Sequence, residues 1–296
     1  MTSIGWVGLG AMGSALAGRV LDEGHTVYGT NRTKRRAEQL IERGLIWRDT
    51  PREVAEEAEV VFSMVTDTRA LQAITDGPDG ILAGLRPGGV YVDMSTVSPE
   101  ASAEIALRVR ELGAAMLDAP VSGSVPAAHE GSLAIMVGGD PDAFARVEPL
   151  LRDFGHTITH VGGNGKALMM KLALNISLAV QMIAFSEGVV LAAKGGVDPE
   201  QAIEVLNSSP LGSPMLKLRG PLLLNRPDQA WFDIELMQKD IGLVLEQGRS
   251  LQVSLPTAAI ADELLTTARA LGHGKEDIVA VADVLAHLSG RDRVAA

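Results

Sequence analysis

Short apolar runs alternate with longer helical segments along the first 162 residues. Runs of strand length, bounded by glycine or polar residues, lie at 3–7, 26–30, 60–65, 91–94, 115–118, 133–137 and 157–161. Helix-start signals stand between them. The sequence Thr50-Pro51-Arg52-Glu53 has the form of a capping box with proline at the first helical position. Because strands that alternate with helices form largely parallel sheets with helices on both faces, we expect an α/β domain here.

The second half of the chain has a helical pattern only. Residues 165–195 form an apolar stretch rich in Ala, Leu and Met without proline, which favours one helix roughly 40 Å long. Its apolar residues run all round, so we expect most of it to be buried. Asn175, Ser177 and Gln181 interrupt the stretch and argue against a bilayer span. Further helices are expected at 198–206, 233–251, 256–271 and 276–288.

A glycine-rich sequence follows the first apolar run at once and leads into a predicted helix at 14–23. It reads Gly8-Leu9-Gly10-Ala11-Met12-Gly13, which is G-x-G-x-x-G with a strand before it and a helix after it. The first glycine allows a tight turn, the second lets a pyrophosphate approach the backbone, and the third lets helix and strand pack closely. The free N–H groups at the start of the helix then bind the anion. We expect a Rossmann dinucleotide-binding domain at 1–162 and an all-α domain at 163–296, joined by the long helix.

The end of the second predicted strand indicates which dinucleotide is bound. Domains that bind NAD usually place an acidic residue here for the ribose hydroxyls. This chain has Asn31, Arg32 and Thr33 instead, followed by three further cations at 34–36. A solvated basic helix start is the alternative, but the position favours a site for a 2′-phosphate. We expect NADP(H) to be preferred over NAD(H), with Val65 and Thr96, at the ends of later strands, lining the same crevice.

Composition narrows the classes of function. The chain has 26 Lys and Arg against 37 Asp and Glu, a net charge of −11, so nucleic-acid binding is not expected. The absence of cysteine excludes disulfides, thiol nucleophiles and cysteine metal sites. The six histidines form no pair with ligand spacing on a helix, and we expect no metal site. Because the N-terminus enters a strand pattern directly, without a signal peptide, cytoplasmic residence is the default expectation.

Two groups of polar residues are candidates for substrate chemistry. Lys171 and Asn175 lie four apart in the long apolar helix, so they share one face. A lysine that reaches solvent and an asparagine that bonds a neighbouring carbonyl is the alternative. Residues 119–131 are expected to form a long loop, in which Ser122, Gly123 and Ser124 offer hydroxyl and N–H groups to a carboxylate. A simple turn is the alternative there, and the G-x-S-x-G setting of a nucleophilic serine is absent.

Four motifs, in order along nearly the whole chain, resemble those of the β-hydroxyacid dehydrogenase family, which includes 3-hydroxyisobutyrate dehydrogenases. They are G-L-G-A-M-G at 8–13, D-A-P-V-S-G at 118–123, G-N-G-K-A-L-M-M-K-L-A-L-N at 163–175, and K-D at 239–240. The sequences at 31–33 and 121–131 are most similar to the NADP-using glyoxylate/succinic semialdehyde reductase branch. Two positions depart from the family pattern: Leu174 stands where many members have asparagine, and Ser124 where many have glycine.

The resemblance implies an NADP-dependent oxidoreductase whose helical domain, 163–296, binds a small carboxylate-bearing substrate. Because the long helix offers a large apolar surface, we also expect a homodimer or homotetramer in which C-terminal helices pack across subunits. Lys171 corresponds to the family's catalytic lysine and Asn175 to the asparagine one turn later. The resemblance assigns the substrate carboxylate to Ser122 and Gly123. It places Lys239 near the nicotinamide and substrate, and Thr96 beside the nicotinamide ribose.

The implied chemistry needs one proton for each hydride. Hydride from NADPH reaches an aldehyde or ketone carbon, and the Lys171 ammonium stabilises the charge on oxygen and donates the proton. Burial and the neighbouring Lys239 would lower the lysine pKa from its ordinary value of about 10.4. An imine reductase of the same fold and a non-catalytic dinucleotide-binding module are the alternatives, and both are expected to lack a lysine at 171. The sequence does not name the substrate.

Overall fold

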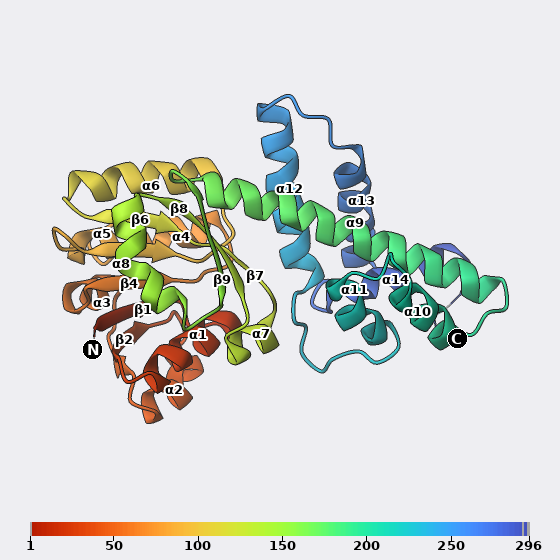
Figure 1. Ribbon diagram of the computed structural model, residues 1–296, viewed down its shortest axis with the longest axis horizontal. Helices are drawn as coiled ribbons and strands as arrows, with labels where there is room; N and C mark the ends of the chain where they lie inside the picture. Colours follow the sequence, from red (N-terminus) through yellow and green to blue (C-terminus); the bar gives the residue numbers. More distant parts are fainter. Residues whose placement is uncertain (1, 292, 295–296) are drawn as a thin grey trace. The chain divides into compact units, whose positions relative to one another are not determined.

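The computed structural model describes residues 2–291 and 293–294 and divides into two compact units, Met1–Lys171 (unit 1) and Leu172–Ala296 (unit 2). Unit 1 is an α/β domain and unit 2 is helical, as the sequence pattern predicts (Figure 1). The division falls within the long helix α9 (Lys166–Lys194), which begins shortly after the boundary predicted at 162/163.

Unit 1 is built on one mixed sheet. In the described part of the chain it has nine strands in the order β3-β2-β1-β4-β5-β6-β8-β7, with β9 beside β8. The strands β3 to β6 of this path are parallel and follow the Rossmann order 3-2-1-4-5-6, whereas β8 runs antiparallel to β6 and β7. The bounds are β1 Ser3–Val7, β2 Thr26–Thr30, β3 Ile46–Trp47, β4 Val60–Ser63, β5 Val90–Asp93, β6 Ala115–Asp118, β7 Val121–Ser122, β8 Ala134–Gly139 and β9 Thr157–Gly162.

Helices cover both faces of this sheet, and each face has its own apolar core. Trp6 and Phe62 pack on one face against α1, α2, α7 and α8, whereas Val61 and Tyr91 pack on the other against α3, α5 and α6. Successive strand residues point to opposite faces, which produces this separation. The helices of unit 1 are α1 Ala11–Asp22, η1 Lys34–Ala37, α2 Glu38–Glu42, α3 Pro51–Glu57, α4 Thr68–Thr75, α5 Ile81–Gly84, α6 Pro99–Glu111, α7 Val125–Glu130 and α8 Pro141–Leu151.

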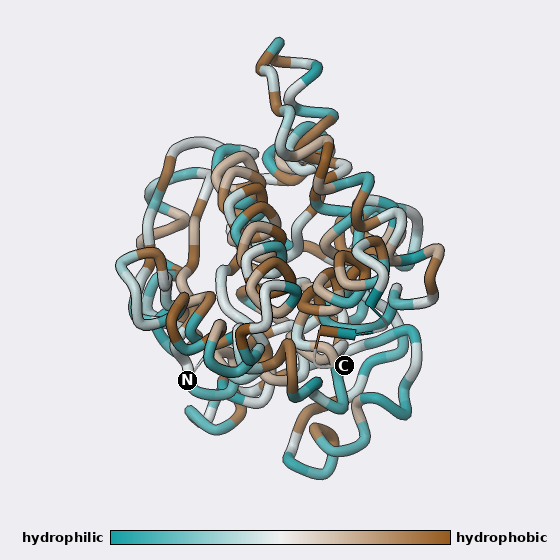
Figure 2. Tube along the Cα trace, turned by 90° about the vertical axis from the view of Figure 1, so that its right-hand side faces the viewer, coloured by the Kyte–Doolittle hydropathy of each residue, from teal (hydrophilic) through white to brown (hydrophobic). Residues whose placement is uncertain are grey.

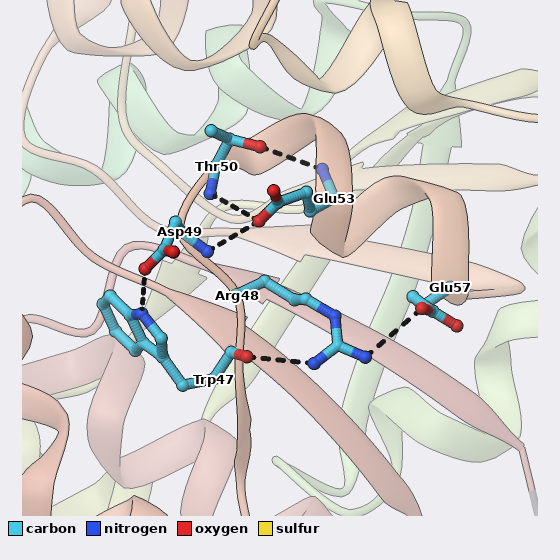
Figure 3. Close-up of polar contacts among 6 residues, drawn as sticks. All are labelled: Trp47, Arg48, Asp49, Thr50, Glu53 and Glu57. Atoms are coloured by element: carbon cyan, nitrogen blue, oxygen red, sulfur yellow. Dashed lines mark hydrogen bonds and ion pairs between the residues drawn. The ribbon is translucent and has the colours of Figure 1, made fainter.

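The predicted strands are confirmed to within two residues at each end. The capping box at the start of α3 is also confirmed: Thr50 Oγ1 accepts a hydrogen bond from Glu53 N at 3.1 Å, and Glu53 Oε2 accepts one from Thr50 N at 3.3 Å (Figure 3). The expectation of a long loop at 119–131 is wrong. The segment forms β7 and then α7, because Pro126 occupies the first helical turn and Gly131 ends the helix in the left-handed region.

Unit 2 consists of helices around a second apolar core. Its members after α9 are α10 Pro199–Ser208, α11 Pro214–Arg219, η2 Gly220–Leu223, α12 Ile234–Ser250, α13 Pro256–Ala270, η3 Ile278–Ala280 and α14 Val281–Leu288. The predicted helix at 276–288 is therefore divided into η3 and α14. Asp277 caps η3 by accepting a hydrogen bond from Val279 N at 3.3 Å. The core brings together Phe185 of α9, Met237 of α12 and Val279 of η3.

The long helix α9 is a single uninterrupted element, but the expectation that most of it is buried is wrong within this single chain. Buried residues follow a helical stripe that includes Leu172, Asn175 and Ala179, whereas Met170 is 44% and Leu191 is 75% exposed. In Figure 2 brown apolar and teal polar stretches alternate along the helical parts of the trace. By length and composition α9 is apolar enough to cross a membrane, a property that core helices of soluble proteins share.

Candidate active site

The glycine loop between β1 and α1 has the geometry of a phosphate cradle. Gly8 has φ 95°, and a Cβ there would collide with Met64 O; a Cβ on Gly13 would collide with Gly8 O. At Gly10, in contrast, an added Cβ would meet no atom within 4 Å, and no side chain caps α1 at this residue. The first and third glycines are thus required for packing. The second leaves open space just before α1, and the free N–H groups in the first turn of a helix stabilise an anion.

The end of β2 is fastened to this loop. Asn31 Oδ1 accepts a hydrogen bond from Leu9 N at 3.1 Å, and Asn31 Nδ2 donates one to Thr33 O at 3.0 Å. Arg32 and Thr33 are exposed beside it. One asparagine therefore holds the glycine loop and the basic segment together. A carboxylate here could accept the bond from Leu9 N but could not donate one to Thr33 O.

Of the cations at 34–36, Lys34 contacts a neighbouring ring. Its ammonium lies 5.1 Å from the centre of the Trp47 ring, a cation–π contact. Trp47 is itself fixed, because its Nε1 donates a hydrogen bond to Asp49 Oδ1 at 2.7 Å (Figure 3). The Lys34 ammonium is therefore directed towards Trp47. Arg32, the cation that directly follows Asn31 in the sequence, is exposed.

A buried polar network supports the loops that contain Val65 and Thr96. Ser63 Oγ and Ser95 Oγ each donate to Asp93 Oδ1 at 2.6 Å, and Val65 N donates to Ser95 Oγ at 2.9 Å. Ser63 and Asp93 are register partners at the ends of β4 and β5. Sequence reasoning missed this network, although polar residues that end two adjacent apolar strands were a usable signal. Val65 and Thr96 themselves are half-buried.

The network also contains the hydroxyl of Tyr91, which lies 2.8 Å from Ser63 Oγ. Burial raises the pKa of Tyr91 well above its ordinary value, and the nearby Asp93 raises it further. Tyr91 is therefore a neutral member of the network, and holds the ends of β4 and β5 together through Ser63 and Asp93.

The three candidate carboxylate ligands lie at the β7–α7 junction. Ser122 is half-buried at the end of β7, Gly123 is exposed, and Ser124 is 8% exposed just before α7. Gly123 has φ 133°, and a Cβ there would lie 2.5 Å from Leu133 Cδ2, so only glycine fits. The backbone at Gly123 consequently stays accessible between two serines.

In unit 2, three polar residues on two helices form one cluster. Asn175 of α9 is 1% exposed and donates a hydrogen bond from Nδ2 to Asp240 Oδ2 at 2.5 Å. Asp240 of α12 is also ion-paired with Lys239, whose side chain is 25% exposed. Because Asp240 is buried, residues 239–240 are not a simple pair of surface charges. Sequence reasoning placed Asp240 in a motif but missed its bond to Asn175.

The catalytic candidate Lys171 is half-buried and is the last residue of unit 1. It lies on α9 one turn before Asn175, as the spacing predicts. Its side chain is thus presented from the same helix as the buried Asn175–Asp240 pair. Across residues 2–291 and 293–294 no group of three or more His, Asp or Glu side chains is arranged to hold a metal ion.

Two family comparisons together cover nearly the whole chain. Residues 3–162 match the NAD-binding domain of 6-phosphogluconate dehydrogenase, and residues 163–285 match the NAD-binding domain of NADP-dependent 3-hydroxyisobutyrate dehydrogenase. The chain is 36% identical over 282 residues to 2-hydroxy-3-oxopropionate reductase of Escherichia coli (strain K12), covering 95% of this chain and 96% of that protein. It is 33% identical over 290 residues to chloroplastic glyoxylate/succinic semialdehyde reductase 2 of Arabidopsis thaliana, covering 98% of this chain and 81% of that protein.

A solved structure supports the same relationship. The structure of Psf3 in complex with NADP+ and 2-OPP has a TM-score of 0.89 and 28% identity, over 95% of this chain and 99% of that one. The fold predicted from the sequence, a Rossmann domain followed by a helical domain, is therefore also the fold of a dinucleotide-binding relative.

Proposed function

The chain belongs to the 3-hydroxyisobutyrate dehydrogenase family of NAD(P)-binding oxidoreductases, and from this premise we propose that it reduces a small aldehyde or keto acid with NADPH. The observation that carries the proposal is the pair on α9: a lysine at 171 and, one turn later, the buried Asn175 bonded to Asp240. A lysine one helical turn from a fixed, buried polar pair suits proton transfer, which requires a positioned donor. Glyoxylate and semialdehydes are the substrate class that the named relatives suggest.

The residues of unit 1 suit the cofactor. The open space at Gly10 and the uncapped start of α1 would hold the pyrophosphate, while Val65 and Thr96 would border the nicotinamide half. When bound, the reduced nicotinamide supplies the hydride. The protein must then supply the proton, orient the substrate and limit access of water.

Lys171 is the proposed proton donor. As the carbonyl oxygen gains negative charge, an ammonium beside it stabilises that charge and delivers the proton. Ser122 and the N–H of Gly123 bind the substrate carboxylate, with Ser124 behind them, and so fix the orientation of the reacting carbon. Lys239 adds positive charge for an anionic substrate, and its ion pair with Asp240 fixes its position. Asn175 holds Asp240 through a hydrogen bond and so keeps Asn175, Asp240 and Lys239 together.

A panel of substrates tests this proposal. Purified protein is assayed with NADPH and glyoxylate, succinic semialdehyde, tartronate semialdehyde or a cyclic imine, in parallel with Lys171→Ala. We expect turnover of at least one aldehyde acid, a loss on the order of 100-fold or more in kcat for the variant, and nearly unchanged NADPH binding. Reduction of the imine alone would select the imine reductase alternative. NADPH binding without turnover of any compound would indicate a non-catalytic module, and full activity of Lys171→Ala would refute the proton donor.

A further inference from the structure

The last residue of β6 is bonded to the first turn of α9. Asp118 is completely buried, and its Oδ1 accepts hydrogen bonds from Gly165 N at 2.8 Å and Asn164 Nδ2 at 3.4 Å. Its Oδ2 accepts one from Leu168 N at 3.4 Å. Both carboxylate oxygens are thus used to hold the start of the helix, at the end where the backbone dipole favours negative charge.

This cap differs from an ordinary one in its origin. A helix is normally capped by a side chain just before it, as α8 is by Asp140, which accepts from Asp142 N and Ala143 N at 3.0 and 2.9 Å. The residue before α9 is Gly165, which has φ 83° and no side chain. The cap comes instead from a residue 47 positions earlier, on a central strand.

The surrounding backbone is shaped to admit this carboxylate. A Cβ on Gly138 of β8 would lie 2.7 Å from Asp118 Oδ2 and 2.9 Å from Gly163 O. A Cβ on the next residue, Gly139, would lie 3.2 Å from Asn164 Nδ2. Two consecutive glycines of β8 therefore leave room for Asp118 and for the turn that precedes α9, so the contact is a built feature of the fold.

Asp118 stands between the two parts of unit 1 that the proposed reaction uses. The chain that leaves Asp118 reaches Ser122 and Gly123 four and five residues later, and the helix it caps presents Lys171 three residues after Leu168. We propose that Asp118 is a positioning residue, whose ionised carboxylate fixes α9 relative to the β7–α7 junction and so sets Lys171 against the bound substrate. This inference rests on the proposed function, since it concerns the geometry of the same proton transfer.

The ionisation state of Asp118 gives the inference a signature. Burial raises the pKa of Asp118 from 3.8 to about 6, although the hydrogen bonds from Gly165, Leu168 and Asn164 act in the opposite direction. The elements around it carry further ionisable side chains, including Tyr91 and Asp93 of β5, Glu100 of α6, His160 of β9 and Lys166 of α9. Below about pH 6 the protonated carboxyl loses the charge that strengthens its bonds to α9.

The experiment compares Asp118→Ala and Asp118→Asn with Asp140→Ala. Each variant loses a carboxylate that caps a helix of unit 1, but α8 bears none of the proposed site residues. For Asp118→Ala we expect kcat to fall roughly 10- to 100-fold with NADPH binding changed less than about twofold, because small misplacement of a catalytic group is costly. Wild-type kcat should decline on the acid side with an apparent pKa near 6. Asp118→Asn should lack this decline, and Asp140→Ala should keep wild-type kcat at reduced thermal stability.

The outcomes separate a positioning role from capping alone. If Asp118→Ala keeps wild-type kcat and loses only thermal stability, as Asp140→Ala should, Asp118 caps the helix and does not position Lys171. If Asp118→Ala does not fold, the acid decline in wild type and Asp118→Asn decides instead, and identical declines would overturn the inference. Failure of the proposed function is recognised independently, because Lys171→Ala would then be active, or wild type would reduce no aldehyde acid.

Discussion

Asn175 donates a hydrogen bond to Asp240 across 2.5 Å, and each of the two residues is only 1% exposed. Asp240→Ala would leave the Asn175 amide without this acceptor and Lys239 without its carboxylate. We expect the free energy of unfolding to fall by about 1–3 kcal/mol, because a buried donor loses its partner. Urea unfolding measures this change. Asp262→Ala, which removes an acidic residue from the middle of α13, is the control and should change stability by less than about 0.5 kcal/mol.

Ser122→Ala tests the proposed carboxylate site. The variant loses one hydroxyl donor but keeps the Gly123 backbone, so we expect KM for the aldehyde acid to rise about 3- to 30-fold, equivalent to roughly 0.7–2 kcal/mol. The dissociation constant for NADPH should stay nearly constant. The methyl ester of the same substrate should be a poor substrate for wild type and should be less affected by the substitution. Equal activity on acid and ester would contradict a carboxylate site.

Because of Asp118, the free energy of unfolding should decrease as the pH rises from about 3.8 to about 6. Its folded pKa of about 6 lies above the ordinary 3.8, so the native state binds more protons between these values. The stabilising effect of the protonated form is complete below about pH 3.8 and is lost as pH rises through about 6. Relative to Asp118→Asn, wild type should lose up to about 3 kcal/mol over this range, as about two pKa units imply.

Urea unfolding of both proteins from pH 4 to pH 7 measures the difference, and parallel stability curves would contradict the raised pKa. A carboxylate that destabilises the fold when ionised, yet is proposed to be needed in that form for turnover, is an example of stability lost to function.

The glycine loop could be predicted from the sequence because each of its glycines meets a requirement of the local backbone, and the spacing of the glycines shows this. The contacts of Asp118 with Gly165 and of Asn175 with Asp240 were out of reach, since they join residues 47 and 65 positions apart. No local periodicity reports such pairs. The helix α7 was missed because Pro126 suggests a turn, although proline also suits the first helical turn. The stretch at 166–194 is apolar all round, so its pattern does not show which side of the helix packs against the rest of this chain.

The exposed apolar residues of unit 2 predict self-association. Leu191 of α9 is 75% exposed and Leu211 is 79% exposed, which is unusual for large apolar side chains. We expect light scattering to give two or four times the 31.1 kDa chain mass, with C-terminal helices packed across subunits. The double substitution Leu191→Lys and Leu211→Lys should shift the protein towards smaller species. Leu107→Lys, at a 55% exposed leucine of α6, is the control and should not. A monomeric wild type would refute this prediction.

Cofactor preference depends on the short segment after β2. Asn31 bonds to the glycine loop through Leu9 N, and the exposed Arg32 and Thr33 follow it without any carboxylate to repel a 2′-phosphate. Arginine binds phosphate through two N–H groups and stacks on aromatic rings, and charge-assisted hydrogen bonds contribute about 1.5–3 kcal/mol each. One or two such bonds should raise kcat/KM for NADPH over NADH by about ten- to several-hundred-fold. Arg32→Ala should lose most of that ratio, chiefly because NADPH binds more weakly.

The control Arg110→Ala removes an exposed arginine from the last turn of α6, changes the net charge equally, and should keep the ratio. Wild-type preference for NADH, or an unchanged ratio in Arg32→Ala, would show that this segment does not select the cofactor.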